Sequence, residues 1–124
     1  MISCGERQGT APNPEVEGQQ WLSKARTALS DSDLVKASAA IDSLRSQCAE
    51  AFNAREEGIL LLDSIELAEA RRQLADAQKA AAQQGLDIYA RDSVDTQLDR
   101  FATKVRFYEK KLEHDIAGFR QHEQ

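Results

Sequence analysis

The sequence predicts an all-α protein of three to four helices, in which a short helix hairpin is followed by a long antiparallel helical hairpin. Leucines recur every seven residues along residues 55–84, a stretch without proline, which keeps one face of a helix apolar. Two prolines, 6% aromatic and 30% charged residues favour long helices over a sheet. A chain of 124 residues fits one domain. We expect a flexible leader over 1–14, one helical domain over 15–120 and a frayed tail over 121–124.

The first two helices follow the leader directly. Pro14 precedes the first helix, predicted over 15–30, and acidic residues occupy its first turn, where the helix dipole favours them. Ser32 or Asp33 is the candidate cap of a second helix over 33–52. Its apolar residues step by three and four and form one stripe: Leu34, Ala37, Ile41, Leu44, Cys48 and Ala51. Cys48 is therefore expected to be a small buried residue.

Together these two helices resemble one tetratricopeptide-type hairpin. The matching positions are the aromatic, small and bulky residues of the family's packing pattern: Trp21, Ala25, Ala28, Ala37, Ile41 and Leu44. The usual helix-ending proline is absent near Ala49, and no second copy of the signature follows. Because one repeat cannot form the concave groove of a full array, the resemblance implies a shape rather than a ligand.

The third helix is predicted along the leucine repeat of Leu60, Leu67 and Leu74. We expect a tight bend near residues 52–54 to separate it from the second helix, although a continuous helix stays open. Gly85 is expected to end it as a C-terminal cap.

A fourth helix is predicted over 93–120, capped by Asp92 or Ser93. Before it, Leu86, Ile88 and Tyr89 are expected to fold back over the end of the third helix. Apolar residues step by three and four along the fourth helix: Leu98, Phe101, Val105, Tyr108, Leu112 and Phe119. Asp115 interrupts this series. The short connection predicts antiparallel pairing with the third helix.

The sequence offers little support for catalysis, a cofactor or a metal. His114 and His122 lie eight apart and have no recognised ligand spacing, so we expect solvated histidines and predict no metal site, no catalytic residues and no cofactor. The acids along the third helix are expected to form a solvated face: Glu56, Glu57, Asp63, Glu66, Glu69 and Asp76. A net charge of −5 argues against nucleic-acid binding.

Three apolar residues stand beside the predicted helix seams and are candidates for a partner-binding surface. Phe107 lies next to the seam of the fourth helix, and Leu61 and Leu62 flank the stripe of the third. The alternative is that the first two helices cover them.

Cys4 is the candidate site for a lipid. The start Met1-Ile2-Ser3-Cys4-Gly5 looks like the end of a bacterial lipobox, in which a small residue precedes the lipidated cysteine. Met1 departs from the usual leucine, and we expect the charged and apolar parts of a signal peptide to lie upstream of it. The alternative is a cytosolic protein with a free thiol.

A lipobox-like start, a Gly/Pro tether and two helix hairpins, in that order, resemble the small helical lipoproteins of Bacteroides-type bacteria. The residues that carry the resemblance are Cys4 and the runs 41–45, 60–70 and 104–115. It implies an outer-membrane lipoprotein that faces the periplasm or the cell surface. Our first hypothesis is therefore a non-enzymatic, lipid-anchored protein that docks on an envelope protein or complex. Surface-exported members of this group tend to carry several acids just after the cysteine. This chain has only Glu6 there, so the resemblance favours the periplasmic side over the cell surface. The alternative function is a soluble cytosolic coiled-coil adaptor, and a homo-oligomer stays open in either case.

Overall fold

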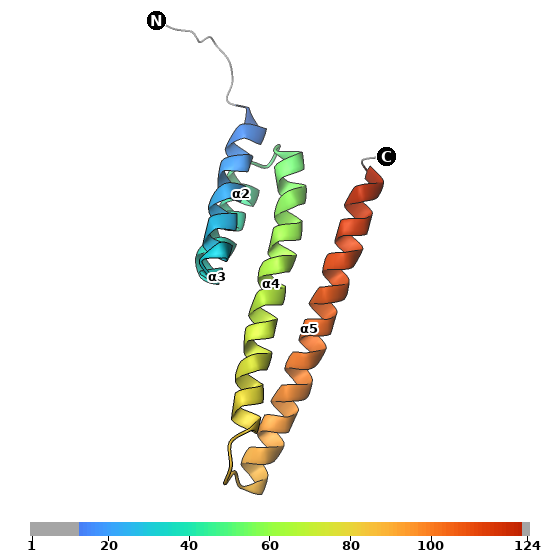
Figure 1. Cartoon of the computed structure of the whole chain (residues 1–124). Coiled ribbons are helices and arrows are strands. Elements are labelled where there is room, and N and C mark those ends of the chain that lie inside the picture. The colour runs from blue at the N-terminus through green and yellow to red at the C-terminus, as the bar shows by residue number, and fades with distance from the viewer. Residues whose placement is uncertain (1–12, 123–124) are drawn as a thin grey trace, which may run out of the picture. The chain divides into compact units, whose positions relative to one another are not determined.

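Four helices make up the part of the chain that the computed structural model describes, residues 13–122. They are α2 (Pro14–Ser30), α3 (Leu34–Gln47), α4 (Phe52–Ala81) and α5 (Ile88–His122), and no strand occurs among these residues (Figure 1). The predicted all-α architecture of packed hairpins is thereby confirmed. Contacts within the chain divide it into two compact units, and the boundary in the sequence lies between Gly58 and Ile59. Cys4 lies outside the described residues.

The turn between α2 and α3 is closed by backbone hydrogen bonds. The Asp33 N–H donates to the Ala28 carbonyl at 2.8 Å and the Ser32 N–H donates to the Leu29 carbonyl at 3.0 Å, the pattern of a Schellman motif. Ser32 takes the left-handed conformation that this motif requires, with a φ of 60°. The Asp33 side chain then accepts the Lys36 N–H at 3.0 Å and caps α3, as predicted.

In the first unit, α2 and α3 pack closely through small residues. Leu22, Ile41 and Leu44 are its largest fully buried side chains, and the alanines beside them are buried as well: Ala25, Ala28, Ala37 and Ala40. A Cβ on Gly18 would stand 2.7 Å from the Ala54 Cβ, so α2 also touches the first turn of α4. Ala37, Ile41 and Leu44 of the predicted stripe therefore lie in the core of this unit, whereas Leu34 is half-buried.

The connection between α3 and α4 lies earlier than predicted. α3 ends at Gln47, and the chain turns over residues 48–51, so the expected bend at 52–54 is wrong. Cys48 and Ala51 remain buried in this connection, which confirms that Cys48 is a small buried residue. The physical reason is a capping contact from α2: the Glu15 carboxylate accepts the Asn53 N–H at 2.9 Å and the Ala54 N–H at 3.2 Å, which fixes the start of α4 at Phe52.

The second unit is an antiparallel hairpin of α5 and the part of α4 that follows Gly58 (Figure 1). Leu67, Ala70 and Val105 form its buried cluster, and Leu74, Tyr108 and Leu112 pack against them. Polar contacts follow the same register, because α5 residue numbers fall as those of α4 rise. The partners from one end to the other are Asp63 with Lys111, Arg71 with Glu109 and Gln73 with Lys104. The predicted pairing of the two long helices is confirmed.

The turn of this hairpin differs from the prediction. α4 ends at Ala81, and Gly85 takes a φ of 80° in the loop beyond it rather than at the helix end. Asp87, not Asp92 or Ser93, caps α5, because its side chain accepts the Ala90 N–H at 2.7 Å. The expectation that Leu86, Ile88 and Tyr89 cover the end of α4 is wrong for two of them. Ile88 and Tyr89 are 78% and 84% exposed on the first turn of α5, and Leu86 is half-buried.

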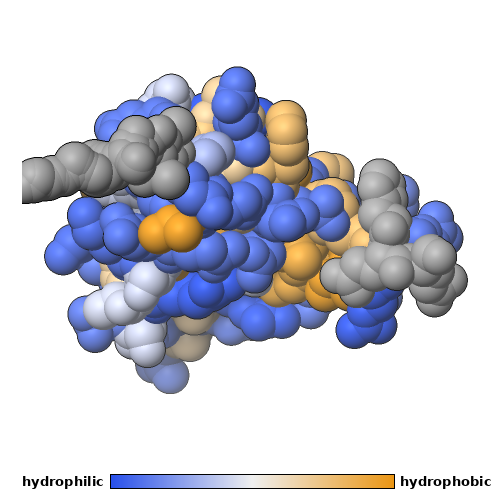
Figure 2. Space-filling view, turned by 90° about the horizontal axis from the view of Figure 1, so that it is seen from above, coloured by the Kyte–Doolittle hydropathy of each residue, from blue (hydrophilic) through white to orange (hydrophobic). Residues whose placement is uncertain are grey.

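Hydrophilic residues cover most of the face seen in Figure 2, with a few hydrophobic residues between them. Among the described residues, no helix has both the length and the apolar character needed to cross a membrane.

Candidate functional site

The most unusual side chain of the second unit is a buried acid on α4. Asp63 is 3% exposed, and among the described residues it is the one charged residue in the buried class. It lies between Leu60 and Leu67 of the leucine repeat, which is why its side chain points into the hairpin. The prediction of a wholly solvated acidic face is therefore wrong at Asp63.

Lys111 on α5 compensates the charge of Asp63. Its Nζ donates to Asp63 Oδ1 at 2.7 Å and to Asp115 Oδ2 at 2.8 Å, one turn further along α5. The lysine thus bridges two carboxylates from both helices. Asp63 Oδ2 is buried and has no hydrogen-bond partner among the described residues. Asp115, which interrupts the predicted seam, is the sequence signal that could have revealed this cluster.

Within the cluster of Asp63, Lys111 and Asp115, the pKa values of the two acids shift in opposite directions. Burial raises the pKa of Asp63, with the neighbouring Asp115 adding to the effect and Lys111 opposing it. Hydrogen bonds from Asp63 and Lys111 lower the pKa of Asp115 to about 2. The same two carboxylates raise the pKa of Lys111, which stays charged. Asp63 is therefore the acid of this pair that takes up a proton first as the pH falls.

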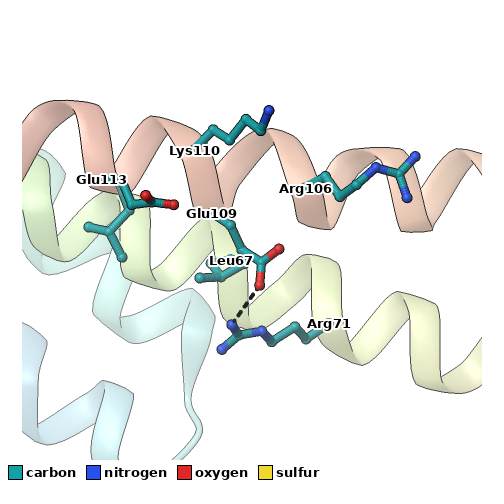
Figure 3. Close-up of a pocket in the computed structure, with 7 residues that line it drawn as sticks. Leu67, Arg71, Arg106, Glu109, Lys110 and Glu113 are labelled. Atoms are coloured by element: carbon teal, nitrogen blue, oxygen red, sulfur yellow. Dashed lines mark hydrogen bonds and ion pairs between the residues drawn. The ribbon is translucent and has the colours of Figure 1, made fainter.

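A shallow groove of about 540 Å³ runs between α4 and α5. Its lining combines two leucines with charged side chains: Leu67, Leu112, Arg71, Arg106, Glu109, Lys110 and Glu113. Figure 3 shows Arg71 and Glu109 facing one another across the groove, joined by an ion pair of 3.3 Å. The apolar floor and charged rim are typical of a surface for protein contact rather than a pocket that encloses a small molecule.

An exposed aromatic side chain lies on the same unit. Phe107 is 59% exposed and its ring meets that of Tyr108 edge to face, with 5.1 Å between the ring centroids. Tyr108 packs against the buried cluster of the hairpin, so it holds one side of the exposed ring in place. The prediction that Phe107 lies off the centre of the seam is confirmed, whereas its binding role stays a prediction.

The other predicted site residues are placed differently. Leu61 and Leu62 are both half-buried, so each offers only part of its side chain to a partner. The His114 side chain is 87% exposed, and its Nδ1 lies 3.5 Å from Asp115 Oδ1. Among the described residues, no three His, Cys, Asp or Glu side chains converge as metal ligands do.

Comparison with protein-family models, with curated proteins and with solved structures finds no match to this chain.

Proposed function

We propose that this chain is a non-enzymatic helical protein held at the outer membrane by a lipid on Cys4, where it docks on a protein of the cell envelope. The observation that carries the docking part is the exposed Phe107 of α5, on the same α4·α5 hairpin as the mixed-charge groove. Aromatic residues and arginines are enriched in protein interfaces.

The anchoring part of the proposal has separate support. The sequence before Gly5 is similar to a lipobox, and a polar, glycine-containing stretch separates Cys4 from Asn13, which caps α2 by accepting the Glu15 N–H at 2.9 Å. A cysteine carrying several acyl chains would anchor stably, since each buried methylene adds to membrane affinity. In this proposal the tetratricopeptide-like α2 and α3 follow the anchor in the chain and precede the α4·α5 hairpin.

The test of anchoring is the mass of the N-terminal peptide, isolated from membranes of the native host. A diacyl or triacyl mass on Cys4 is expected. An unmodified Cys4 in the soluble fraction would refute the anchor and favour the cytosolic adaptor.

The test of docking is site-specific photo-crosslinking in the native host. A crosslinker at position 107 is expected to trap one defined envelope protein, whereas a crosslinker at Val35, which is 83% exposed on α3, is the matched control. Equal labelling from both positions would refute Phe107 as a docking residue.

A further inference from the structure

The solvent side of α5 carries a row of charges that is sorted by sign. Asp95, Asp99, Thr103, Arg106 and Lys110 follow one another at spacings of three and four, and all five are exposed. The first two are acidic, the central one is small and neutral, and the last two are basic. The row covers about 22 Å of helix at the rise of an α-helix.

These four charges have no partners of opposite sign within the hairpin. None of them forms an ion pair with another described residue. Within residues 13–122, the Arg106 Nη2 donates only to the Thr103 hydroxyl, at 3.2 Å. Figure 3 shows Arg106 and Lys110 extending away from the Arg71–Glu109 pair, at the edge of the groove. By contrast, Lys104 and Lys111 on other sides of α5 are both bonded to α4.

The order of the charges is self-complementary. Asp99 and Arg106 lie at equal distances from a midpoint between Ala102 and Thr103, and Asp95 and Lys110 share the same midpoint. We infer that this face of α5 binds a second copy of the chain, with the two α5 helices antiparallel and crossing at Thr103. Asp99 of each copy then faces Arg106 of the other, and Asp95 faces Lys110, so that one twofold axis satisfies all the charges of the row.

The same register also predicts where the contact ends. Asp92 would face Glu113 of the other copy, and these two acids repel one another. The contact is therefore confined to about four turns. Exposed ion pairs contribute little each, so the dimer is expected to be weak and to dissociate as salt screens its charges.

This inference goes beyond the proposed function and does not depend on it. If the chain is anchored through Cys4, confinement to a membrane raises the effective concentration of the second copy and favours a weak dimer. The test uses the full chain in solution, so a failure of the dimer leaves the mass measurement on Cys4 unaffected.

The experiment is sedimentation equilibrium of charge-reversed variants. Asp95→Lys with Asp99→Lys makes the row wholly basic, and Arg106→Glu with Lys110→Glu makes it wholly acidic. Each double variant alone is expected to dimerise more weakly by about tenfold or more, because attraction is replaced by repulsion. An equimolar mixture of the two is expected to form a heterodimer, since all facing charges are again opposite. The matched control reverses Asp42 and Glu50, two exposed acids of the first unit.

A gain of affinity gives a second readout that misfolding cannot imitate. Glu113→Lys places a lysine opposite Asp92 of the other copy. It is expected to lower the dissociation constant of the dimer and to raise the salt concentration at which the dimer dissociates. A wild-type chain that stays monomeric at low ionic strength and high protein concentration would overturn the inference. A dimer that both double variants and the Asp42/Glu50 control form equally would do so as well, because another surface would then hold it.

Discussion

Replacing Lys111 by methionine removes the cation on which the buried Asp63 depends. Methionine keeps the apolar stem of the lysine side chain but leaves Asp63 without its hydrogen-bond donor and close to Asp115. The Asp63 side chain is 4% exposed, so water cannot replace the lost contact fully. We expect Lys111→Met to destabilise the α4·α5 hairpin although it makes the protein more apolar.

The expected loss follows from the exposure of the two partners. Removing one member of a fully buried ion pair costs about 3–5 kcal/mol. Because the Lys111 side chain is 41% exposed, solvent screens part of its charge, and we expect a loss of about 2 kcal/mol at pH 7. Burial raises the pKa of Asp63 in the folded state, so the folded chain takes up this proton at a higher pH than the unfolded chain does. The loss of stability in Lys111→Met should therefore shrink as the pH falls through the folded-state pKa of Asp63, because protonation removes the unpaired buried charge.

The assay is urea denaturation followed by circular dichroism at neutral and acidic pH. Lys110→Met is the matched control, since Lys110 is exposed and forms no ion pair with another described residue; a change within about 0.5 kcal/mol is expected. Adding Asp63→Asn to Lys111→Met should recover most of the loss, because the buried charge is gone. The reasoning is refuted if Lys111→Met costs no more than Lys110→Met at pH 7.

Five further changes test the packing, the turn and the titration, each by chemical denaturation. Gly18→Ala should lower the free energy of unfolding by about 1–3 kcal/mol, because its Cβ would stand 2.7 Å from the Ala54 methyl; the fluorescence of the single tryptophan reports the loss. Gly118→Ala is the control, since nothing lies within 4 Å of its Cβ, and it should stabilise the fold slightly. Ser32→Gly should stabilise by about 1 kcal/mol by relieving a left-handed serine, and no gain would contradict that conformation. Leu67→Asp should cost more than about 3 kcal/mol, and an unchanged melt would contradict its place in the core. The pKa of Asp115 is lower in the folded chain than in the unfolded chain, so the ionised Asp115 stabilises the fold at pH values above its unfolded-state pKa. Asp115→Asn should therefore lower the free energy of unfolding by about 1–2 kcal/mol at pH 7, and by progressively less as the pH falls from about 4 to 2.

Periodicity predicted the elements and the core because burial on a helix follows its repeat. Leu67 and Val105 are buried as their spacing indicated, and Asp33 caps α3 through a contact that is local in sequence. The start of α4 could not be found in this way. Glu15 of α2, 38 positions before Asn53, caps it. This contact forms only after the chain has folded, so the residues near the start of α4 could not predict it.

The candidate site was predicted in part. Phe107 stands off the seam of α5 by its spacing alone, and it is exposed. Asp63 was missed because Glu66 and Glu69 follow it at equal spacing and suggested one solvated ribbon, although its place between two leucines of the repeat indicated burial. Asp115 and Lys111, one turn apart on α5, are the complementary half of the same signal. Recognising the cluster required the register between the helices.

The turn between α4 and α5 is held from both sides by residues that are close in sequence. Arg91 donates from α5 to the Ala81 carbonyl at 2.7 Å and to the Gln83 carbonyl at 3.2 Å, while Asp87 caps α5 itself. Closing such a short loop costs little chain entropy, whereas the contact between Asp63 and Lys111 spans 48 positions. We therefore expect the pairing of α4 and α5 to form first at this turn and then to extend toward Lys111. Substitution of Arg91 should then slow folding, and substitution of Lys111 should mainly speed unfolding.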